Sequence, residues 1–144
     1  MNLLLAAIGY IALSGGALLP QGGNGAGGGM VHLGAFALEY LAIEGEIGAY
    51  ERNQQYAVQG LWRWQGGELY NRFFGYSRFD PFFTFGAKGY YGENEGNYGP
   101  CLGVGAFYYL DDNWSIRADL DAALLLDTRR EMLYSAAIGL QYDF

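Results

Sequence analysis

The sequence predicts an all-β protein, an antiparallel up-and-down β-barrel of eight strands. Apolar residues recur at every second position through most of the chain, which is the period of a strand and not of a helix. The composition agrees, because 24 glycines and 17% aromatic residues suit closely packed strands with large apolar faces. A length of 144 residues indicates a single domain over residues 1–144.

Charge and rare residues exclude several classes of function. The formal net charge of -7 argues against nucleic-acid binding, which needs a basic face. Cys101 is the only cysteine, so the chain forms no internal disulfide. His32 is the only histidine and the acids are scattered, which argues against the usual metal clusters. The sequence indicates no cofactor and no small-molecule ligand.

The apolar run at residues 1–13 has three interpretations. A signal-peptide core normally follows Lys or Arg, and neither is present here. A membrane helix would be interrupted early by Ser14, Gly15 and Gly16. The strand count favours a first strand, and an origin as a signal peptide stays open. The stretch "SGGALLPQGGNGAGGG", residues 14–29, predicts a flexible loop.

Seven further strands follow from the alternation. The clearest is "WSIRADLDAALL", which pairs with the preceding strand through the turn signal "LDDN" at 110–113. Residues 68–78 alternate poorly and predict a short helix or an ordered turn. With residues 1–13 the total is eight, and bacterial single-chain barrels have even strand numbers. The seven predicted strands are 30–38, 41–50, 56–65, 82–91, 101–109, 114–125 and 134–144.

The apolar faces are too bulky for the inside of an eight-stranded barrel, whose interior is only just filled by side chains. They carry most of the large aromatic residues, whereas the opposite faces are mostly small or polar. We therefore expect the apolar faces to contact lipid, which makes the barrel transmembrane. Strand ends on the side of the 110–113 turn carry a predicted aromatic girdle at the membrane interface: Trp62, Trp64, Tyr108 and Trp114.

The inward faces carry four acids and three bases: Glu44, Glu46, Arg63, Lys88, Arg117, Asp119 and Asp121. Charges enclosed in a barrel must be paired, so this near balance predicts a salt-bridge network that plugs the lumen. The hairpin register places Gly105 opposite Asp119 and Gly103 opposite Asp121, which leaves room for both carboxylates. The alternative is a solvated outer face of a soluble sheet.

Three stretches resemble a known family. The end "YSAAIGLQYDF" is similar to the C-terminal assembly signal of Gram-negative outer-membrane barrels. "GVGAFYYLDDNWSIRADLD" and "FGYSRFDPFFTFGAKGYYG" resemble segments of the OmpA-like outer-membrane β-barrel domain family. The resemblance implies eight strands, short periplasmic turns, longer outer loops, and insertion by the outer-membrane assembly machinery. That machinery would recognise Tyr134, Ile138, Leu140, Tyr142 and Phe144. Because this sequence contains no peptidoglycan-binding domain, we do not expect the family's tethering to the cell wall to apply.

These observations favour a non-enzymatic protein of the bacterial outer membrane, with lipid and the assembly machinery as partners and a structural or surface-interaction role. Its outer loops would be 14–29, 51–55, 92–99 and 126–131. A soluble lipocalin-like barrel and a narrow channel are alternatives. A lipid-modifying enzyme is disfavoured, because no catalytic triad is visible among His32 and the four serines, Ser14, Ser77, Ser115 and Ser135.

Overall fold

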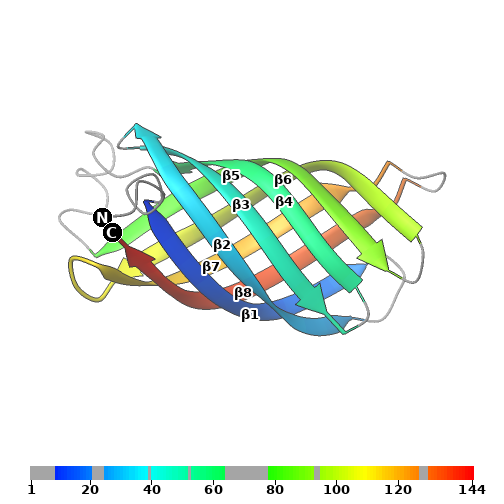
Figure 1. The fold of residues 1–144 in the computed structure, drawn as a ribbon, viewed down its shortest axis with the longest axis horizontal. Coiled ribbons are helices and arrows are strands. Elements are labelled where there is room, and N and C mark those ends of the chain that lie inside the picture. The colour runs from blue at the N-terminus through cyan, green and yellow to red at the C-terminus, as the bar shows by residue number, and fades with distance from the viewer. Residues whose placement is uncertain are drawn as a thin grey trace, which may run out of the picture.

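The structure is a closed barrel of eight antiparallel strands, as the sequence predicts. The computed structural model describes residues 9–20, 25–38, 40–51, 53–63, 78–92, 95–126 and 130–144. Each strand pairs with the next and β1 pairs with β8, so the start of β1 and the end of β8 lie together at one end of the barrel (Figure 1). We call this the terminal end. The strands are β1 (Tyr10–Pro20), β2 (Ala26–Leu38), β3 (Leu41–Tyr50), β4 (Asn53–Arg63), β5 (Phe79–Gly92), β6 (Glu95–Tyr109), β7 (Trp114–Leu124) and β8 (Met132–Asp143).

The first hairpin differs from the prediction. The predicted first strand at 1–13 is displaced, because β1 runs from Tyr10 to Pro20 and residues 1–8 lie outside the described residues. The predicted loop at 14–29 is wrong, because most of it belongs to β1 and β2. Gly15 pairs with Gly29 and Gly16 with Gly28. Because these strand segments have few large side chains, they show no alternation in the sequence. Their strand structure therefore cannot be recognised from the period of apolar residues.

Three of the four connections opposite the termini are shorter than predicted, and the fourth is about as long as predicted. β4 begins at Asn53 and β6 at Glu95, so the predicted loops 51–55 and 92–99 shrink to residues 51–52 and 93–94. The other two connections at that end span 21–25 and 125–131. At the terminal end, the 110–113 turn is held by Asp111, whose Oδ1 accepts hydrogen bonds from the backbone nitrogens of Asn113 and Trp114. The predicted helix or turn at 68–78 falls almost wholly outside the described residues.

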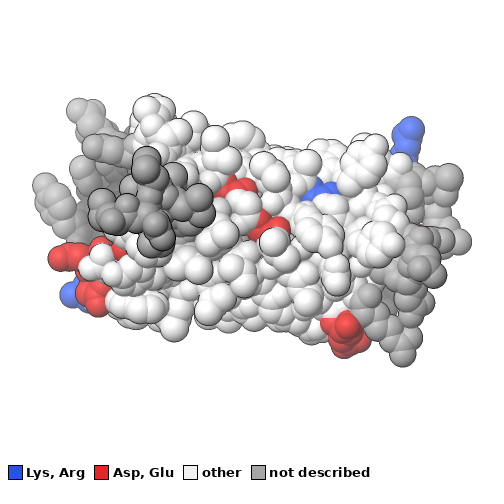
Figure 2. Space-filling model, viewed as in Figure 1, with Lys and Arg blue, Asp and Glu red and all other residues white. Residues whose placement is uncertain are grey.

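Apolar side chains cover the outside of the barrel. Leu102 is 70% exposed and Val58 67%, although both lie in the middle of strands. Apart from Glu95, whose side chain is not described, all charged residues of the described strands lie on the inward face. In Figure 2 the wall is mostly white, with red and blue at the two ends and in a few small patches along the middle. A soluble lipocalin-like barrel would have the opposite orientation, with its apolar face inside.

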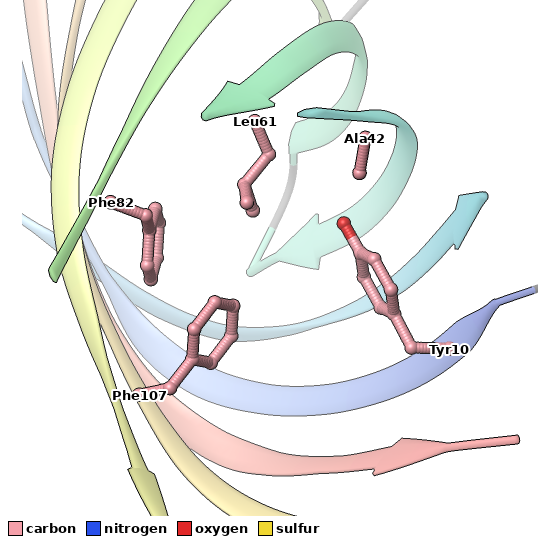
Figure 3. Close-up of a cluster of buried hydrophobic side chains, with 5 residues drawn as sticks. All are labelled: Tyr10, Ala42, Leu61, Phe82 and Phe107. Carbon is pink, nitrogen blue, oxygen red and sulfur yellow. The ribbon is translucent and has the colours of Figure 1, made fainter. Parts of the chain in front are cut away.

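Two apolar clusters fill the ends of the interior. The terminal-end cluster is drawn in Figure 3 and comprises Tyr10, Ala42, Leu61, Phe82 and Phe107. The opposite-end cluster comprises Leu18, Met30, Tyr50, Leu133 and Ala137. The expectation of mostly small interior residues is therefore only partly right. Glycines accommodate the rings, because a Cβ on Gly105 would lie 2.3 Å from Cζ of Phe82. Within the described residues, no helix is long and apolar enough to span a bilayer.

Candidate functional site: the polar network inside the barrel

Charged and polar side chains occupy the interior between the two apolar clusters. The structure places all seven charged residues predicted for the lumen on inward-facing positions of β3, β4, β5 and β7. Six of them are joined with His32 by side-chain contacts into one set, which we call the lumen network: Glu44, Glu46, Lys88, Arg117, Asp119 and Asp121. Arg63 lies apart from it, at the terminal end of β4.

Arg117 is the centre of one half of the lumen network. Its side chain is completely buried; Nη2 donates to Oε1 of Glu44 at 2.9 Å, and Nε to Oδ2 of Asp119 at 2.8 Å. Its Nη1 also contacts Oε2 of Glu44. The guanidinium carbon lies 5.2 Å from the centre of the Phe82 ring. A planar cation with several donors suits this position, because it binds two carboxylates while it stacks on an aromatic face.

Lys88 is the cation of the other half. Its Nζ lies 3.0 Å from Oδ2 of Asp121 and 3.4 Å from Oε1 of Glu46. Asp121 also accepts hydrogen bonds from Thr84 and Ser135. As the predicted register requires, Gly103 lies opposite Asp121, and a Cβ at this position would lie 2.2 Å from Oδ1 of Asp121.

Arg63 forms a separate pair that the sequence did not indicate in full. Its Nε donates to Oδ2 of Asp80 at 2.9 Å, and Tyr109 also donates to that carboxylate. Asp80 is buried but was left out of the predicted set, because the predicted strand started at residue 82 and β5 starts at Phe79. The alternation of Asp80 with Phe82 and Thr84 is the signal that could have placed it inside.

His32 is the other residue that sequence reasoning missed. Its Nε2 lies 3.3 Å from Oγ of Ser14, and its Nδ1 lies 3.3 Å from Oε1 of Glu44 and 3.4 Å from Oε2 of Glu46. The arguments against a triad and against a metal cluster assumed that residues scattered in the sequence are also far apart in space. That assumption is wrong, because the barrel brings these residues together. Ser14, Glu44 and Glu46 all face inward, and His32 is the cross-strand partner of Glu46.

Comparison with known proteins gives matches in structure only. No family model and no curated protein matches the chain. OprG of Pseudomonas aeruginosa matches with a TM-score of 0.68 at 10% identity, over 94% of this chain and 96% of that one. The N-terminal β-barrel domain of OprF from the same organism has a TM-score of 0.67 at 14% identity, over 94% and 98%. Neisserial surface protein A gives 0.63 at 11% identity, over 94% and 95%.

The chain has the fold of an eight-stranded outer-membrane β-barrel. In a barrel of this fold, strand ends lie where aromatic girdles form. Trp62, Tyr108 and Trp114 are exposed on the outer surface at the terminal end, and Trp64 lies outside the described residues.

The C-terminal residues of this outer-membrane barrel fold form part of its outer surface. Tyr134, Ile138, Leu140 and Phe144 are exposed along β8 and just after it. Tyr142 is partly buried, and its ring centre lies 5.0 Å from that of Trp114 and 5.2 Å from that of Phe144. These rings continue the aromatic surface of the terminal end across the β7–β8 hairpin.

Proposed function

We propose that this chain is a non-enzymatic barrel of the bacterial outer membrane with a structural or surface-interaction role. The observation that carries the proposal is the outward face of the described strands, which is almost wholly apolar and has no charged side chain among those that the structure describes. Such a surface is stable in lipid and would aggregate in water. Strands of 10 to 15 residues are long enough to cross the apolar layer with a tilt.

The interior supports a plugged lumen. The two apolar clusters lie toward opposite ends of the barrel, and the lumen network lies between them. Ion pairs and packed rings in these positions would leave no hydrated route for ions through the barrel. Connections as short as residues 51–52 and 93–94 offer little surface for a large ligand, which favours a structural role over a receptor role.

Two partners follow from this proposal. Outer-membrane lipid would contact the apolar wall. The barrel assembly machinery would recognise the last strand through the outward residues Tyr134, Ile138, Leu140, Tyr142 and Phe144. Removing Phe144 should slow insertion by purified assembly machinery in proteoliposomes. Leu13→Ala, which shortens an apolar side chain on the adjacent β1, should have a smaller effect.

The first test is refolding of the chain from inclusion bodies into detergent micelles, followed by gel electrophoresis in SDS with and without boiling. A folded barrel resists SDS and migrates as a compact species until it is heated. We expect this shift in mobility. Solubility and β-type circular dichroism in plain buffer, with no shift, would contradict a membrane barrel.

Conduction tests the plugged lumen separately. In a planar bilayer we expect no steady single-channel current from the refolded chain. A steady current that is lost on Asp119→Asn substitution would show instead that the lumen network lines an open pore.

A second candidate function rests on Ser14, His32 and Glu44, whose contacts have the order of a hydrolase triad. Burial argues against it, because Ser14 is 8% exposed and His32 1%. We expect no reaction of the refolded chain with a fluorophosphonate probe. Labelling that disappears in Ser14→Ala but persists in Ser135→Ala would establish a reactive serine and contradict the non-enzymatic proposal.

A further inference from the structure

We propose that the lumen binds one divalent transition-metal ion through Nδ1 of His32 and the carboxylates of Glu44 and Glu46. These three side chains are buried, and one ligand atom from each lies within 4.8 Å of the other two. The proposal requires the barrel fold alone and is independent of the role proposed above.

The spacing of the ligand atoms is the first argument. Nδ1 of His32 lies 3.3 Å from Oε1 of Glu44 and 3.4 Å from Oε2 of Glu46. Direct hydrogen bonds between charged groups are shorter, at about 2.7–2.9 Å. Two ligands of one tetrahedral ion, each about 2.1 Å from the metal, are about 3.4 Å apart. The separations therefore match those of atoms that share a metal ion.

The second argument is the orientation of the imidazole. Nε2 of His32 faces Oγ of Ser14 at 3.3 Å, and a serine hydroxyl can accept the Nε2–H hydrogen bond. In that tautomer Nδ1 presents a lone pair toward two carboxylates, a repulsive arrangement unless a cation lies between them. A hydrogen bond from the second ring nitrogen is also how proteins orient metal-binding histidines.

Charge balance is the third argument. The lumen network contains four carboxylates, those of Glu44, Glu46, Asp119 and Asp121, but two permanent cations, Lys88 and Arg117. Arg63 and Asp80 compensate each other elsewhere. An excess of two negative charges in a buried interior is unfavourable. One divalent ion would neutralise this excess while His32 stays neutral and acts as a ligand.

Gln55 provides a fourth and independent observation. It is fully buried and its Nε2 contacts Oε1 of Glu46, yet among the described residues no donor pairs with its Oε1. A buried amide oxygen without a partner is costly. Rotating the amide by a half-turn exchanges nitrogen and oxygen and would direct a neutral oxygen toward the Glu46 side of the cluster. One imidazole with oxygen ligands suits ions such as Zn²⁺, Co²⁺ and Mn²⁺, of which Zn²⁺ is the probe used below.

The metal content of refolded protein tests the site. The untagged full chain is refolded with Zn²⁺ or with EDTA, passed through a desalting column, and analysed by mass spectrometry for zinc. Zinc is added during refolding because the apolar clusters close both ends of the interior. We expect about one zinc per chain, and a fall of about tenfold or more in His32→Gln.

A matched pair of variants separates a specific site from general attraction of cations. Glu46→Gln and Asp119→Asn each remove one negative charge from the lumen network, but Asp119 is not among the proposed ligands. We expect zinc to be lost from Glu46→Gln and retained by Asp119→Asn. Equal loss from both, or equal zinc in the wild type and His32→Gln, would overturn the proposal.

A measurement on the wild type covers the case in which a variant fails to fold. Because His32 is the only histidine, ¹⁵N-histidine labelling gives one pair of ring nitrogen resonances that needs no assignment. We expect Zn²⁺ to shift the Nδ1 resonance while Nε2 stays protonated. Identical ring resonances in zinc-refolded and EDTA-refolded protein would show that His32 does not bind the ion.

Discussion

Gly34 and Gly45 lie on adjacent strands, Gly34 facing the interior of the barrel and Gly45 facing outward. A Cβ on Gly34 would lie 1.9 Å from Cζ of Tyr10, whose hydroxyl donates to Glu44, whereas a Cβ on Gly45 would meet nothing within 4 Å. Gly34→Ala should displace the Tyr10 ring and lower the free energy of unfolding by about 1–3 kcal/mol.

Gly45→Ala is the matched control and should change that free energy by no more than about 1 kcal/mol, with stabilisation as the expected sign. Urea titration of both variants in lipid vesicles measures the two effects. Equal losses would mean that the interior beside Tyr10 is less tightly packed than the structure shows.

Arg117 is the single side chain on which most of the lumen network depends. Arg117→Met removes the cation that pairs with Glu44 and Asp119 and leaves both carboxylates buried. The expected loss of unfolding free energy is about 3–5 kcal/mol. Arg78→Met is the control, because Arg78 is exposed and donates to the carbonyl oxygen of Leu110; it should cost at most about 0.5 kcal/mol. A small loss in Arg117→Met would show that the interior is hydrated.

Among the strands, what the sequence reveals depends on how large the side chains are. β7 combines large and small residues, so its alternation can be recognised in the sequence. The turn Asp111–Asn113 then sets its register against β6. β1 and the start of β2 are rich in Gly and Ala, so their pairing becomes visible only when the barrel closes.

The seam between β1 and β8 is the pairing that closes the barrel, and its register can be tested by cross-linking. Ala17 lies opposite Ala136. In a Cys101→Ala background, cysteines at these two positions should form a disulfide on oxidation, because opposed Cβ atoms are about 4.5–5.5 Å apart. The cross-link is detected by altered mobility after boiling without a reducing agent.

A cysteine at Leu140, paired with the one at Ala17, is the control. Leu140 lies opposite Leu13, four residues along β1 from Ala17, which is a separation of about 13 Å. Cross-linking of this control pair, without cross-linking of the Ala17 and Ala136 pair, would show a slipped seam.

For the barrel as a whole, lipid on the outside has a measurable consequence. Val58 lies at the middle of β4 and is highly exposed. Val58→Lys should cost about 2–4 kcal/mol of unfolding free energy in lipid vesicles, because the charge would lie near the bilayer midplane. Gln54→Lys, near the end of the same strand, should cost at most about 1 kcal/mol. If Val58→Lys left the free energy of unfolding unchanged, this wall would face water.

The interior shows where reasoning from sequence alone stops. Alternation assigned Glu44, Glu46, Lys88 and Arg117 to inward positions, because parity within a strand is a local property. It did not indicate which of them meet, because contacts across the interior depend on the register of all eight pairings. His32 therefore looked isolated in the sequence, although the closed barrel places it between two carboxylates.

The seam also has a consequence for biosynthesis. Residues 10–20 pair with residues 133–143, so β1 gains its second neighbour only when β8 has been translated. A prematurely terminated chain leaves β1 with an unsatisfied edge, and pairing over so long a stretch of sequence makes closure slow. We therefore expect chains that end before β8 to keep β1 exposed and to be cleaved by proteases more readily than the closed barrel.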